Sequence, residues 1–315
     1  MEIRKVTLTL DIQEYQLTIA SCVKRWYNGD DNNGIMLKAP DESNVYQCAW
    51  FYSSNYPSSS IPRPLFTLTY RNNKGLENYW TYSSFTVGSA GTAYINDYSG
   101  NLVFVTNDAT TASETAPFSL QHVFNGYMSG SRYSKTKPYV GHGWKLNVQQ
   151  TLMQVTDSTI SDNYPYVYTD EDGTEHYFYK KMENNQTKYY DEDGLKLELK
   201  INNSNNNEKY TIEDDKNNKR VFNSQGLLNY IMDSNGNTIT VHYASDNKTI
   251  TSVEDDDGNH VYFEKNTVSD YLKSITDPNN RKTTYIYNGG RLEEIRRCDG
   301  KSVYFEYEND NAQII

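Results

Sequence analysis

The 315-residue sequence is poor in cysteine, in basic residues and in long apolar runs, and each shortage excludes a class of protein. Its three cysteines show no Cys-x-x-Cys spacing, which argues against structural zinc and a disulfide framework but leaves a Cys22–Cys48 bridge open. A net charge of −11 argues against a nucleic-acid partner, because phosphate binding needs a clustered basic surface. No apolar run approaches the roughly 18 residues of a membrane-spanning helix.

The opening segment, MEIRKVTLTLDIQEYQL, lacks the uninterrupted apolar core of a signal peptide. Two interpretations follow: a cytosolic protein, or a piece of a longer secreted one. We favour the second interpretation, and therefore expect an extracellular or cell-wall location.

Tyrosine is the residue that the sequence has in excess. The mean hydropathy of −0.83 would suit a disordered chain, but disordered chains are poor in aromatic residues and this one has 29 tyrosines. Tyrosine suits a half-buried sheet surface, where the ring packs and the hydroxyl stays in water. The composition therefore predicts a sheet-rich body.

From about residue 156 onward the sequence is periodic. Seven turn positions recur at near-constant spacing: Gly173, Gly194, Asn217, Gly236, Gly258, Asn280 and Gly300. Acidic or amide residues precede each turn, and a β-branched or aromatic strand follows it. A second turn recurs in at least two units, FNSQGLLNYI and YNGGRLEEI. A period near 21 holds two short strands and two turns, so the predicted unit is a β-hairpin that pairs with its neighbours.

The first half of the chain has strand patterns without this period. VTLTLDI and PLFTLTY alternate apolar and polar residues, and between them Leu17, Ile19, Val23 and Trp26 suggest a short helical turn. Residues 72–155 hold two strand candidates around Asp97–Gly100 and two later ones in APFSLQHVFNGY and GHGWKLNVQQTLMQV. The joints at 88–91 and 141–143 indicate tight turns or close backbone approaches.

Several segments resemble those of the RHS family. YNGGRLEEI and DGKSVYFEYEND resemble its YD repeats, and GLENYWTYSSFTVGSAGTAYINDYSG with GHGWKLN resembles the segment that precedes the repeats in Gram-positive members. RWYNGDDNNGIMLKAPDES and PLFTLTY resemble the end of a DNRLRE-type β-sandwich module. In polymorphic toxins of this family the repeats build a hollow β-shell that holds a C-terminal toxin domain.

The expected fold is all-β, a partial β-sandwich followed by a long curled antiparallel sheet of YD-repeat hairpins that forms an incomplete β-shell. The expected domains are 1–71, the C-terminal part of the DNRLRE-like module; 72–155, the segment leading into the repeats; and 156–315, the hairpin repeats. The resemblance implies a C-terminal toxin or effector domain as partner. It also implies attachment to cell-wall polysaccharide through the N-terminal module.

Calcium is the first ligand to weigh, because the turns are acidic. With Val253 as position 1, an EF-hand-type spacing places Asp255, Asp257 and Glu264 as ligands, but valine offers no side-chain oxygen. These three are weak calcium candidates, and the favoured interpretation is that the acidic turns fold the chain. We expect no cofactor and no metal.

Catalytic patterns are missing. The sequence has no His-Glu-x-x-His and no Gly-x-Ser-x-Gly, and adjacent carboxylates such as Glu293-Glu294 point to opposite faces of a strand. We expect the five histidines to pack or hydrogen-bond on strands, and an enzyme would require a cleft where histidines and carboxylates converge.

The favoured function is a non-enzymatic structural scaffold, the start of an RHS/YD-repeat β-shell that presents or encapsulates a C-terminal effector. The alternative is a carbohydrate- or cell-wall-binding module, with Trp26 and Trp50 as weak candidates for stacking on sugar rings.

Overall fold

The computed structural model describes residues 19–27, 31–36, 38, 51–53, 55, 75–129, 133, 135–158, 160–308 and 313–314. The chain divides into two compact units, Met1–Tyr70 and Arg71–Ile315. The expected border between residues 71 and 72 lies one residue from this division. Most of the expected β-sandwich module, with Trp50, lies outside the described residues.

The first unit contributes helix α1 (Ala20–Tyr27) to the described part of the chain. Val23 and Trp26 are half-buried and Arg25 is exposed, so the apolar side chains lie at helical spacing on one side. The predicted short helical turn is confirmed. Among the described residues, no helix is both long and apolar enough to cross a membrane.

In the second unit a five-stranded antiparallel sheet comes first. Its strands lie in the order of the chain: β1 (Tyr82–Val87), β2 (Gly91–Asn96), β3 (Leu102–Thr110), β4 (Ser119–Asn125) and β5 (Trp144–Leu146). The 3-10 helix η1 (Gly126–Met128) follows β4. The two strands predicted around Asp97–Gly100 are confirmed as β2 and β3, and the prediction missed β1 before them. Gly91 allows the additional turn, because its φ is 150° and a Cβ there would lie 2.3 Å from the carbonyl oxygen of Val105.

A fifteen-stranded antiparallel sheet makes up the rest of this unit. Its strands also follow chain order: β6 (Thr151–Gln154), β7 (Tyr166–Thr169), β8 (Glu175–Glu183), β9 (Gln186–Asp191), β10 (Glu198–Ile201), β11 (Tyr210–Glu213), β12 (Lys219–Phe222), β13 (Leu228–Met232), β14 (Thr238–Tyr243), β15 (Ile250–Glu254), β16 (His260–Lys265), β17 (Leu272–Thr276), β18 (Lys282–Asn288), β19 (Arg291–Arg296) and β20 (Ser302–Tyr304). A separate short pair, β21 (Tyr307–Glu308) and β22 (Gln313–Ile314), comes last. The all-β prediction with a long antiparallel sheet that does not close is confirmed.

One predicted strand is divided between the two sheets. GHGWKLNVQQTLMQV was expected to hold a single strand, but β5 belongs to the first sheet and β6 begins the second. The side chain of Gln149, between them, accepts from Leu146 N and donates to Pro138 O, which fixes the change of direction. The expected border at 155/156 therefore falls after the first strand of the long sheet.

The seven predicted turns all have the expected backbone conformation. Each marked residue has a positive φ, between 58° and 94°: Gly173, Gly194, Asn217, Gly236, Gly258, Asn280 and Gly300. In the turn after β15, one oxygen of Asp255 accepts the N–H groups of Asp257 (3.1 Å) and Asn259 (2.9 Å). Asp233 does the same for Asn235 and Asn237. The acidic residues therefore hold the turns by local hydrogen bonds, as Asx turns do.

The second turn of the unit occurs at four places in the described part of the long sheet, whereas the sequence showed it at two. Besides Gly226 and Gly290, Asn247 (φ 54°) and Asp270 (φ 58°) occupy the left-handed region at equivalent places. A register shift precedes each of these turns, and the strand after each has a buried apolar residue at its first or second position: Leu228, Ile250, Leu272 and Leu292.

Residues 137–142, which we call the strap, cross three of these second turns. Tyr139 N donates to Asp270 O (2.9 Å), and Leu272 N donates to Tyr139 O (2.8 Å). Lys137 makes the same pair of bonds at the turn before β15, and His142 N donates to Gly290 O. Gly141 lies close to Leu292, as predicted for a joint of close approach. The strap therefore fastens three successive hairpins.

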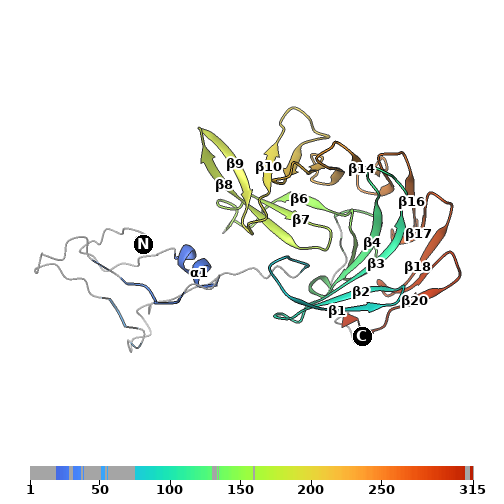
Figure 1. Ribbon diagram of the computed structural model, residues 1–315, viewed down its shortest axis with the longest axis horizontal. Coiled ribbons are helices and arrows are strands. Elements are labelled where there is room, and N and C mark those ends of the chain that lie inside the picture. The colour runs from blue at the N-terminus through green and yellow to red at the C-terminus, as the bar shows by residue number, and fades with distance from the viewer. Residues whose placement is uncertain are drawn as a thin grey trace, which may run out of the picture. The chain divides into compact units, whose positions relative to one another are not determined.

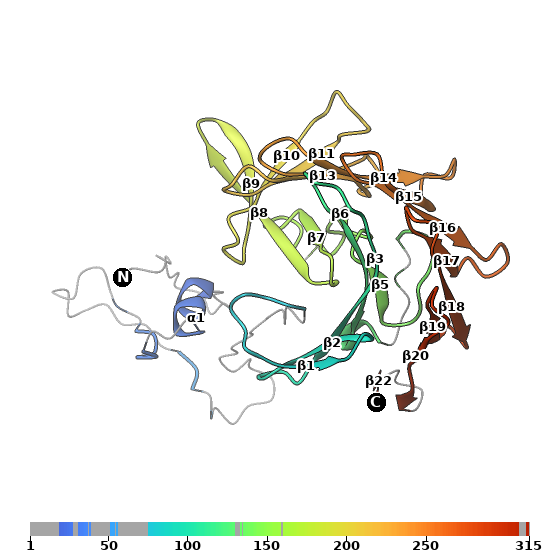
Figure 2. The same cartoon turned by 45° about the vertical axis from the view of Figure 1, so that its right-hand side comes forward.

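The two sheets lie against each other (Figure 1), and their side chains form one apolar core. The five-stranded sheet lies inside the curve of the long sheet, facing strands β14 to β20 (Figure 2). At their contact Trp144 packs against Phe305, and its Nε1 donates to Tyr307 Oη at 2.9 Å. Core formation in this unit thus depends on segments that lie far apart in the sequence.

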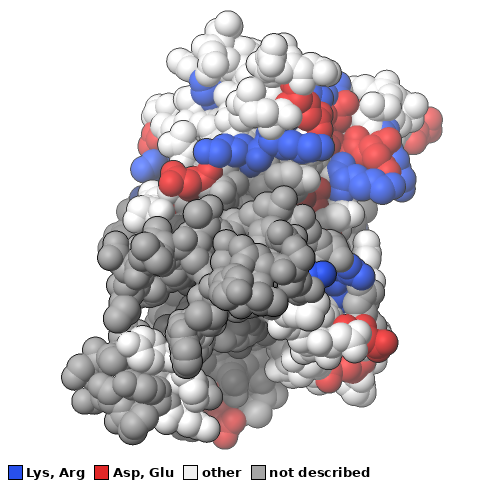
Figure 3. Space-filling model, turned by 90° about the vertical axis from the view of Figure 1, so that its left-hand side faces the viewer, with Lys and Arg blue, Asp and Glu red and all other residues white. Residues whose placement is uncertain are grey.

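The outer surface is charged and mixed in sign. Figure 3 shows Lys or Arg beside Asp or Glu over the described part of one face. Cross-strand ion pairs account for part of this mixing, for example Lys188 with Glu198 (3.3 Å) and Lys200 with Glu213 (2.6 Å). Such exposed pairs contribute about 0–1 kcal/mol each, but they keep the surface polar.

Candidate functional site

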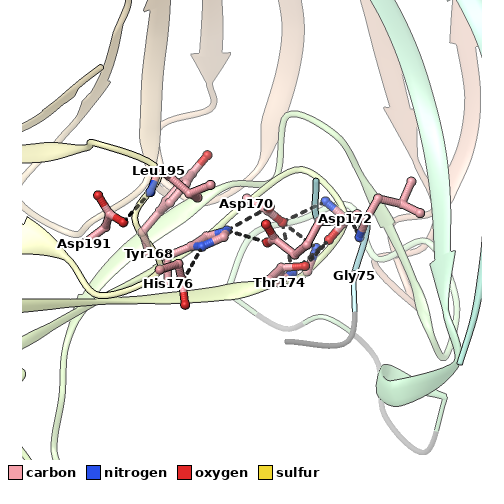
Figure 4. Close-up of polar contacts among 12 residues, drawn as sticks. Gly75, Tyr168, Asp170, Asp172, Thr174, His176, Asp191 and Leu195 are labelled. Atoms are coloured by element: carbon pink, nitrogen blue, oxygen red, sulfur yellow. Dashed lines mark hydrogen bonds and ion pairs between the residues drawn. The ribbon is translucent and has the colours of Figure 1, made fainter. Parts of the chain in front are cut away.

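Five buried or nearly buried ionisable side chains meet at the beginning of the long sheet, and we call them the acid–histidine cluster. Its members are Glu77, Asp170, Asp172, His176 and Asp193. Figure 4 labels Asp170, Asp172 and His176 among them. His176 is 2% exposed and Glu77 is 6% exposed. Charged groups are costly to bury, so each must find a partner.

The turn between β7 and β8 builds the acidic side of the cluster. One oxygen of Asp170 accepts the N–H groups of Asp172, Gly173 and Thr174 at 2.9–3.1 Å. Asp172 accepts the hydroxyl of Thr174 at 2.6 Å. The turn sequence DEDGT therefore folds locally, and it leaves the second oxygen of Asp170 to face His176.

His176 connects this turn to the next acidic turn. Its Nε2 lies 3.1 Å from Asp170 Oδ2, and its Nδ1 lies 3.0 Å from Asp193 Oδ2. The ring stacks on Tyr168 with centroids 5.6 Å apart, and the Tyr168 hydroxyl donates to Gln150. Two acidic partners on opposite nitrogens favour the doubly protonated imidazolium.

Residues 75–77 close the cluster from the far side. Leu76 N donates to Asp172 Oδ2 at 2.6 Å, and Glu77 Oε1 lies 3.5 Å from His176 Nε2. A Cβ on Gly75 would lie 1.7 Å from the hydroxyl oxygen of Thr174, so only glycine fits at this position. The segment just before the five-stranded sheet is thereby fixed to the first hairpin of the long sheet.

The pKa values of the cluster follow from burial and from neighbouring charge. Burial, with Asp170 and Asp193 nearby, raises the pKa of Glu77 to about 8 against the attraction of His176. Burial, with the charge of Asp172, also raises the pKa of Asp170. Burial opposes the charge of His176, but the hydrogen bonds to Asp170 and Asp193 outweigh it and raise its pKa to about 10. At neutral pH the cluster therefore holds a charged histidine and a protonated Glu77.

A buried lysine completes the charge balance. Lys145, on β5, is fully buried, and its Nζ donates to the main-chain oxygen of Asp170. Burial lowers the pKa of this ammonium, and Asp170 and Asp172 oppose that shift. Lys145 thus links the five-stranded sheet to the same acidic turn.

The cluster has proton-binding groups, but catalysis would also need access for a substrate. A cavity of about 410 Å³ lies at β17 and β18, lined by residues such as Tyr271, Lys273 and Tyr287 rather than by cluster members. Ligand atoms of Glu77, Asp170 and His176 lie within 4.8 Å of one another, so these three could hold a metal ion. To do so, His176 would have to give up its bond to Asp170.

The weak calcium candidates do not converge in the described part of the chain. Asp255 and Asp257 belong to the turn before β16, whereas Glu264 lies near the end of that strand. Glu264 binds the ammonium groups of Lys273 (2.5 Å) and Lys282 (2.9 Å), which lowers its pKa to about 2. Asp257 accepts the N–H of Glu114 at 3.1 Å. The structure thus distributes the three carboxylates among separate structural bonds.

The other histidines lie away from the cluster. His122 is buried, bonds Asp108 and stacks on Tyr285 with centroids 4.7 Å apart. His142 belongs to the strap, and His242 and His260 lie on the outer face of the long sheet. Of the sugar-binding candidates, Trp26 is half-buried on α1, and Trp50 lies outside the described residues.

The sequence contained one signal for the acid–histidine cluster that pattern reasoning missed. Two copies of Asp-Glu-Asp-Gly lie one repeat period apart, at 170–173 and 191–194, with His176 on the strand that follows the first. Adjacent hairpins bring equivalent turns together, so a histidine near them is well placed to bridge both. Glu77 and Lys145 could not be found in this way, because they come from another part of the fold.

Comparison with known proteins gives little. No protein-family model matches the sequence, and no curated protein matches it. The crystal structure of TcdB2-TccC3-Cdc42 is similar over 72% of this chain at 13% identity, with a TM-score of 0.24. The chain spans 11% of the length of that structure's chain. A similarity this low assigns neither fold nor function, and the resemblance to YD repeats and to the DNRLRE module stays a prediction.

Proposed function

We propose that residues 71–315 form a non-enzymatic scaffold, the beginning of a hairpin-repeat β-shell. In a secreted or cell-surface protein it would present or enclose a C-terminal effector or toxin. The observation that supports this most is the unbroken order of fifteen antiparallel strands, with the same turn, register shift and buried apolar residue repeated in successive hairpins. Repeats that contact mainly their neighbours build surfaces rather than enclosed catalytic sites.

The core-facing side of the five-stranded sheet is only partly covered by the other described strands. Phe85 pairs with Ala93, which pairs with the buried Phe104, so Phe85 lies on the core face of the five-stranded sheet. Phe85 is nevertheless 57% exposed, and Val87, on the same face, is 55% exposed. An apolar face that remains open beside a core supports a role in packing against further polypeptide.

The acid–histidine cluster supports the same proposal. Its members are hydrogen-bonded to one another and to the backbone of 75–77 and 170–174. A general acid or base must reach a substrate, and a histidine that is 2% exposed with both nitrogens bonded does not. We therefore assign the cluster to holding the first hairpins in place.

Fusion of a small, protease-sensitive reporter domain after Ile315 tests the scaffold proposal. The measurement is the half-life of the reporter under limited proteolysis. A second fusion carries Phe85→Ser and Val87→Ser, both at exposed positions, and is compared with the wild-type fusion. If the scaffold shelters attached polypeptide, the reporter should be cleaved several-fold faster in the Phe85→Ser, Val87→Ser fusion than in the wild-type fusion. Equal half-lives in the two fusions would sink the proposal.

Carbohydrate binding is the second candidate, and exposed aromatic rings favour it. The rings of Trp80 and Tyr98 stack with centroids 5.4 Å apart, and Tyr79 lies 5.6 Å from Trp80. Tyr98 is 77% exposed and Tyr79 is 48% exposed, which leaves ring faces available to a sugar. A glycan array with the wild-type chain and with Tyr98→Ala, Trp26→Ala and Trp50→Ala separates the candidates. Binding lost in one of these variants supports this function, and no wild-type binding excludes it for the glycans on the array.

A further inference from the structure

Two histidines and one glutamate converge on the outer face of three neighbouring strands. His242 on β14, Glu254 on β15 and His260 on β16 contribute one ligand atom each, and these atoms all lie within 4.8 Å of one another. His242 Nε2 is 2.6 Å from Glu254 Oε2, and His260 Nε2 is 3.7 Å from Glu254 Oε1. The three side chains are 28–41% exposed, so a small ion could reach them from solvent.

The strand register explains why they meet. Glu254 pairs directly with His260, and Glu254 and His242 are diagonal neighbours because His242 pairs with Ser252. Residues that are paired or diagonal on one face of an antiparallel sheet lie within reach of each other's side chains. The backbone of three hairpin strands therefore fixes the spacing of the three ligands.

The repeat itself does not require these residues. In the next hairpin unit the equivalent positions hold Glu264, Thr276 and Lys282, and in the one after that Ile286, Arg296 and Ser302. Lys282 and Glu264 there form an ion pair at 2.9 Å, which serves the fold without any histidine. The combination of two imidazoles and a carboxylate is thus a local departure from a repeated surface.

We propose that His242, Glu254 and His260 form a zinc site that clamps strands β14, β15 and β16. Imidazole nitrogen and carboxylate oxygen are ligands that zinc prefers, and two histidines with one carboxylate leave a fourth position open. Tetrahedral bonds of about 2.0 Å place ligand atoms about 3.3 Å apart. His242 Nε2 lies 2.6 Å from Glu254 Oε2 and His260 Nε2 lies 3.7 Å from Glu254 Oε1, so each ring nitrogen is near this distance from one carboxylate oxygen. Zinc takes the Nε2 lone pair of His242, so in the bound form this ring carries its proton on Nδ1.

The surroundings suit a site of this kind. The ring of His260 stacks on Tyr262 with centroids 5.2 Å apart, which limits its rotation. Its Nδ1 is buried and has no hydrogen-bond partner, and its Nε2 faces Glu254. The open position faces solvent, where a water or a side chain from another molecule would complete the coordination.

A zinc titration of the full chain in competition with a chromophoric chelator tests the site. The proposal predicts one tight site in the wild type, and an affinity at least about 100-fold weaker in His242→Ala and in His260→Ala, since even outer-shell changes cost 10–100-fold. Lys282→Ala is the matched control, because it removes a charged side chain at the equivalent place in the next hairpin. Far-UV circular dichroism checks that the variants fold.

Cobalt(II) supplies a second readout that identifies the ligands. Bound cobalt should show d–d absorption without the thiolate-to-cobalt band that Cys22 or Cys298 would give. Glu254→Gln should weaken binding and shift this absorption. Equal zinc affinity in the wild type and both histidine variants would overturn the proposal. A thiolate band that disappears in Cys298→Ser would overturn it as well.

Discussion

The two ends of the long sheet use the same hairpin but are fastened in different ways. Around β7 to β9, buried charges hold the turns together and bind residues 75–77. Around β15 to β19, a buried apolar residue recurs at the start of every second strand, and the strap crosses the turns by backbone hydrogen bonds. The same hairpin fold is therefore stabilised by buried charges at one end and by apolar residues and the strap at the other.

The difference matters because the two kinds of stabilisation respond to different conditions. Burial of apolar side chains contributes roughly 1.5–3 kcal/mol per large residue and changes little with pH. A buried charge cluster is stable only while its members hold complementary charges. The acid–histidine end should therefore depend on pH and the apolar end should not.

Removal of the central histidine should have the largest effect on this comparison. His176→Ala removes the imidazolium that bonds both Asp170 and Asp193, and breaking such a buried cluster costs about 3–5 kcal/mol. Urea denaturation at pH 7 measures the loss of unfolding free energy. Lys200→Ala, which removes an exposed surface ion pair with Glu213, is the control, with an expected cost below about 1 kcal/mol. Equal losses of unfolding free energy in the two variants would show that the acid–histidine cluster does not stabilise the fold.

At the apolar end, Leu272→Ala should cost about 3 kcal/mol, within the range for a fully buried leucine. Its neighbour Lys273→Ala, on the exposed face, should cost less than about 1 kcal/mol. The loss in Leu272→Ala should be the same at pH 6 and pH 9, measured by urea denaturation at both. A strongly pH-dependent loss would contradict the contrast between the two ends.

Gly75→Ala should detach residues 75–77 from the cluster. The new Cβ overlaps Thr174 and Asp172, and overpacking of this kind costs about 2 kcal/mol. Gly236→Ala is the control, since its Cβ meets open space and only the positive φ is penalised, by about 1 kcal/mol. Thermal unfolding of both variants measures the difference, and a Gly75→Ala variant as stable as the wild type would show that this contact is not needed.

Glu77→Gln should have an effect of opposite sign, because it should stabilise the protein. The pKa of Glu77 rises from 4.5 in the unfolded chain to about 8 in the folded protein, so its contribution to stability is full below pH 4.5 and is lost as pH rises through 8. The pKa of His176 rises from 6.5 to about 10 and acts in the same direction. Glutamine stays neutral, so it should stabilise the protein at pH 8, where each unit of the raised pKa is worth about 1.4 kcal/mol, and far less at pH 5. A gain of the same size at both pH values would contradict the raised pKa of Glu77.

The turn pattern could be predicted from the sequence because turns depend on local chemistry. Asn and Gly adopt positive φ at low cost, and Asp at the first position accepts the following N–H groups, so the seven turns were visible as a spacing. The second turn was found in two units, where glycine marks it, and missed at Asn247 and Asp270, where no glycine does. The close approaches at Gly141 and Gly143 were also predicted correctly.

The contacts between distant segments could not be predicted in this way. The strap comes much earlier in the sequence than the turns it crosses, and nothing in its sequence names Asp270 or Gly290 as partners. Glu77 joins Asp170 and His176 only after both sheets are in place. A single sequence shows local preferences, whereas pairings of this kind depend on the assembled fold.

Hydrogen exchange of the wild-type chain at pH 6 and pH 9, corrected for intrinsic rates, tests the central claim most directly. The claim is that one continuous sheet is fastened by charge at one end and by apolar repeats at the other. It predicts that amides of 168–176 and 193–197 lose protection at pH 9, while those of 250–254 and 272–276 keep it. Equal loss at both ends, or loss confined to the apolar end, would contradict it.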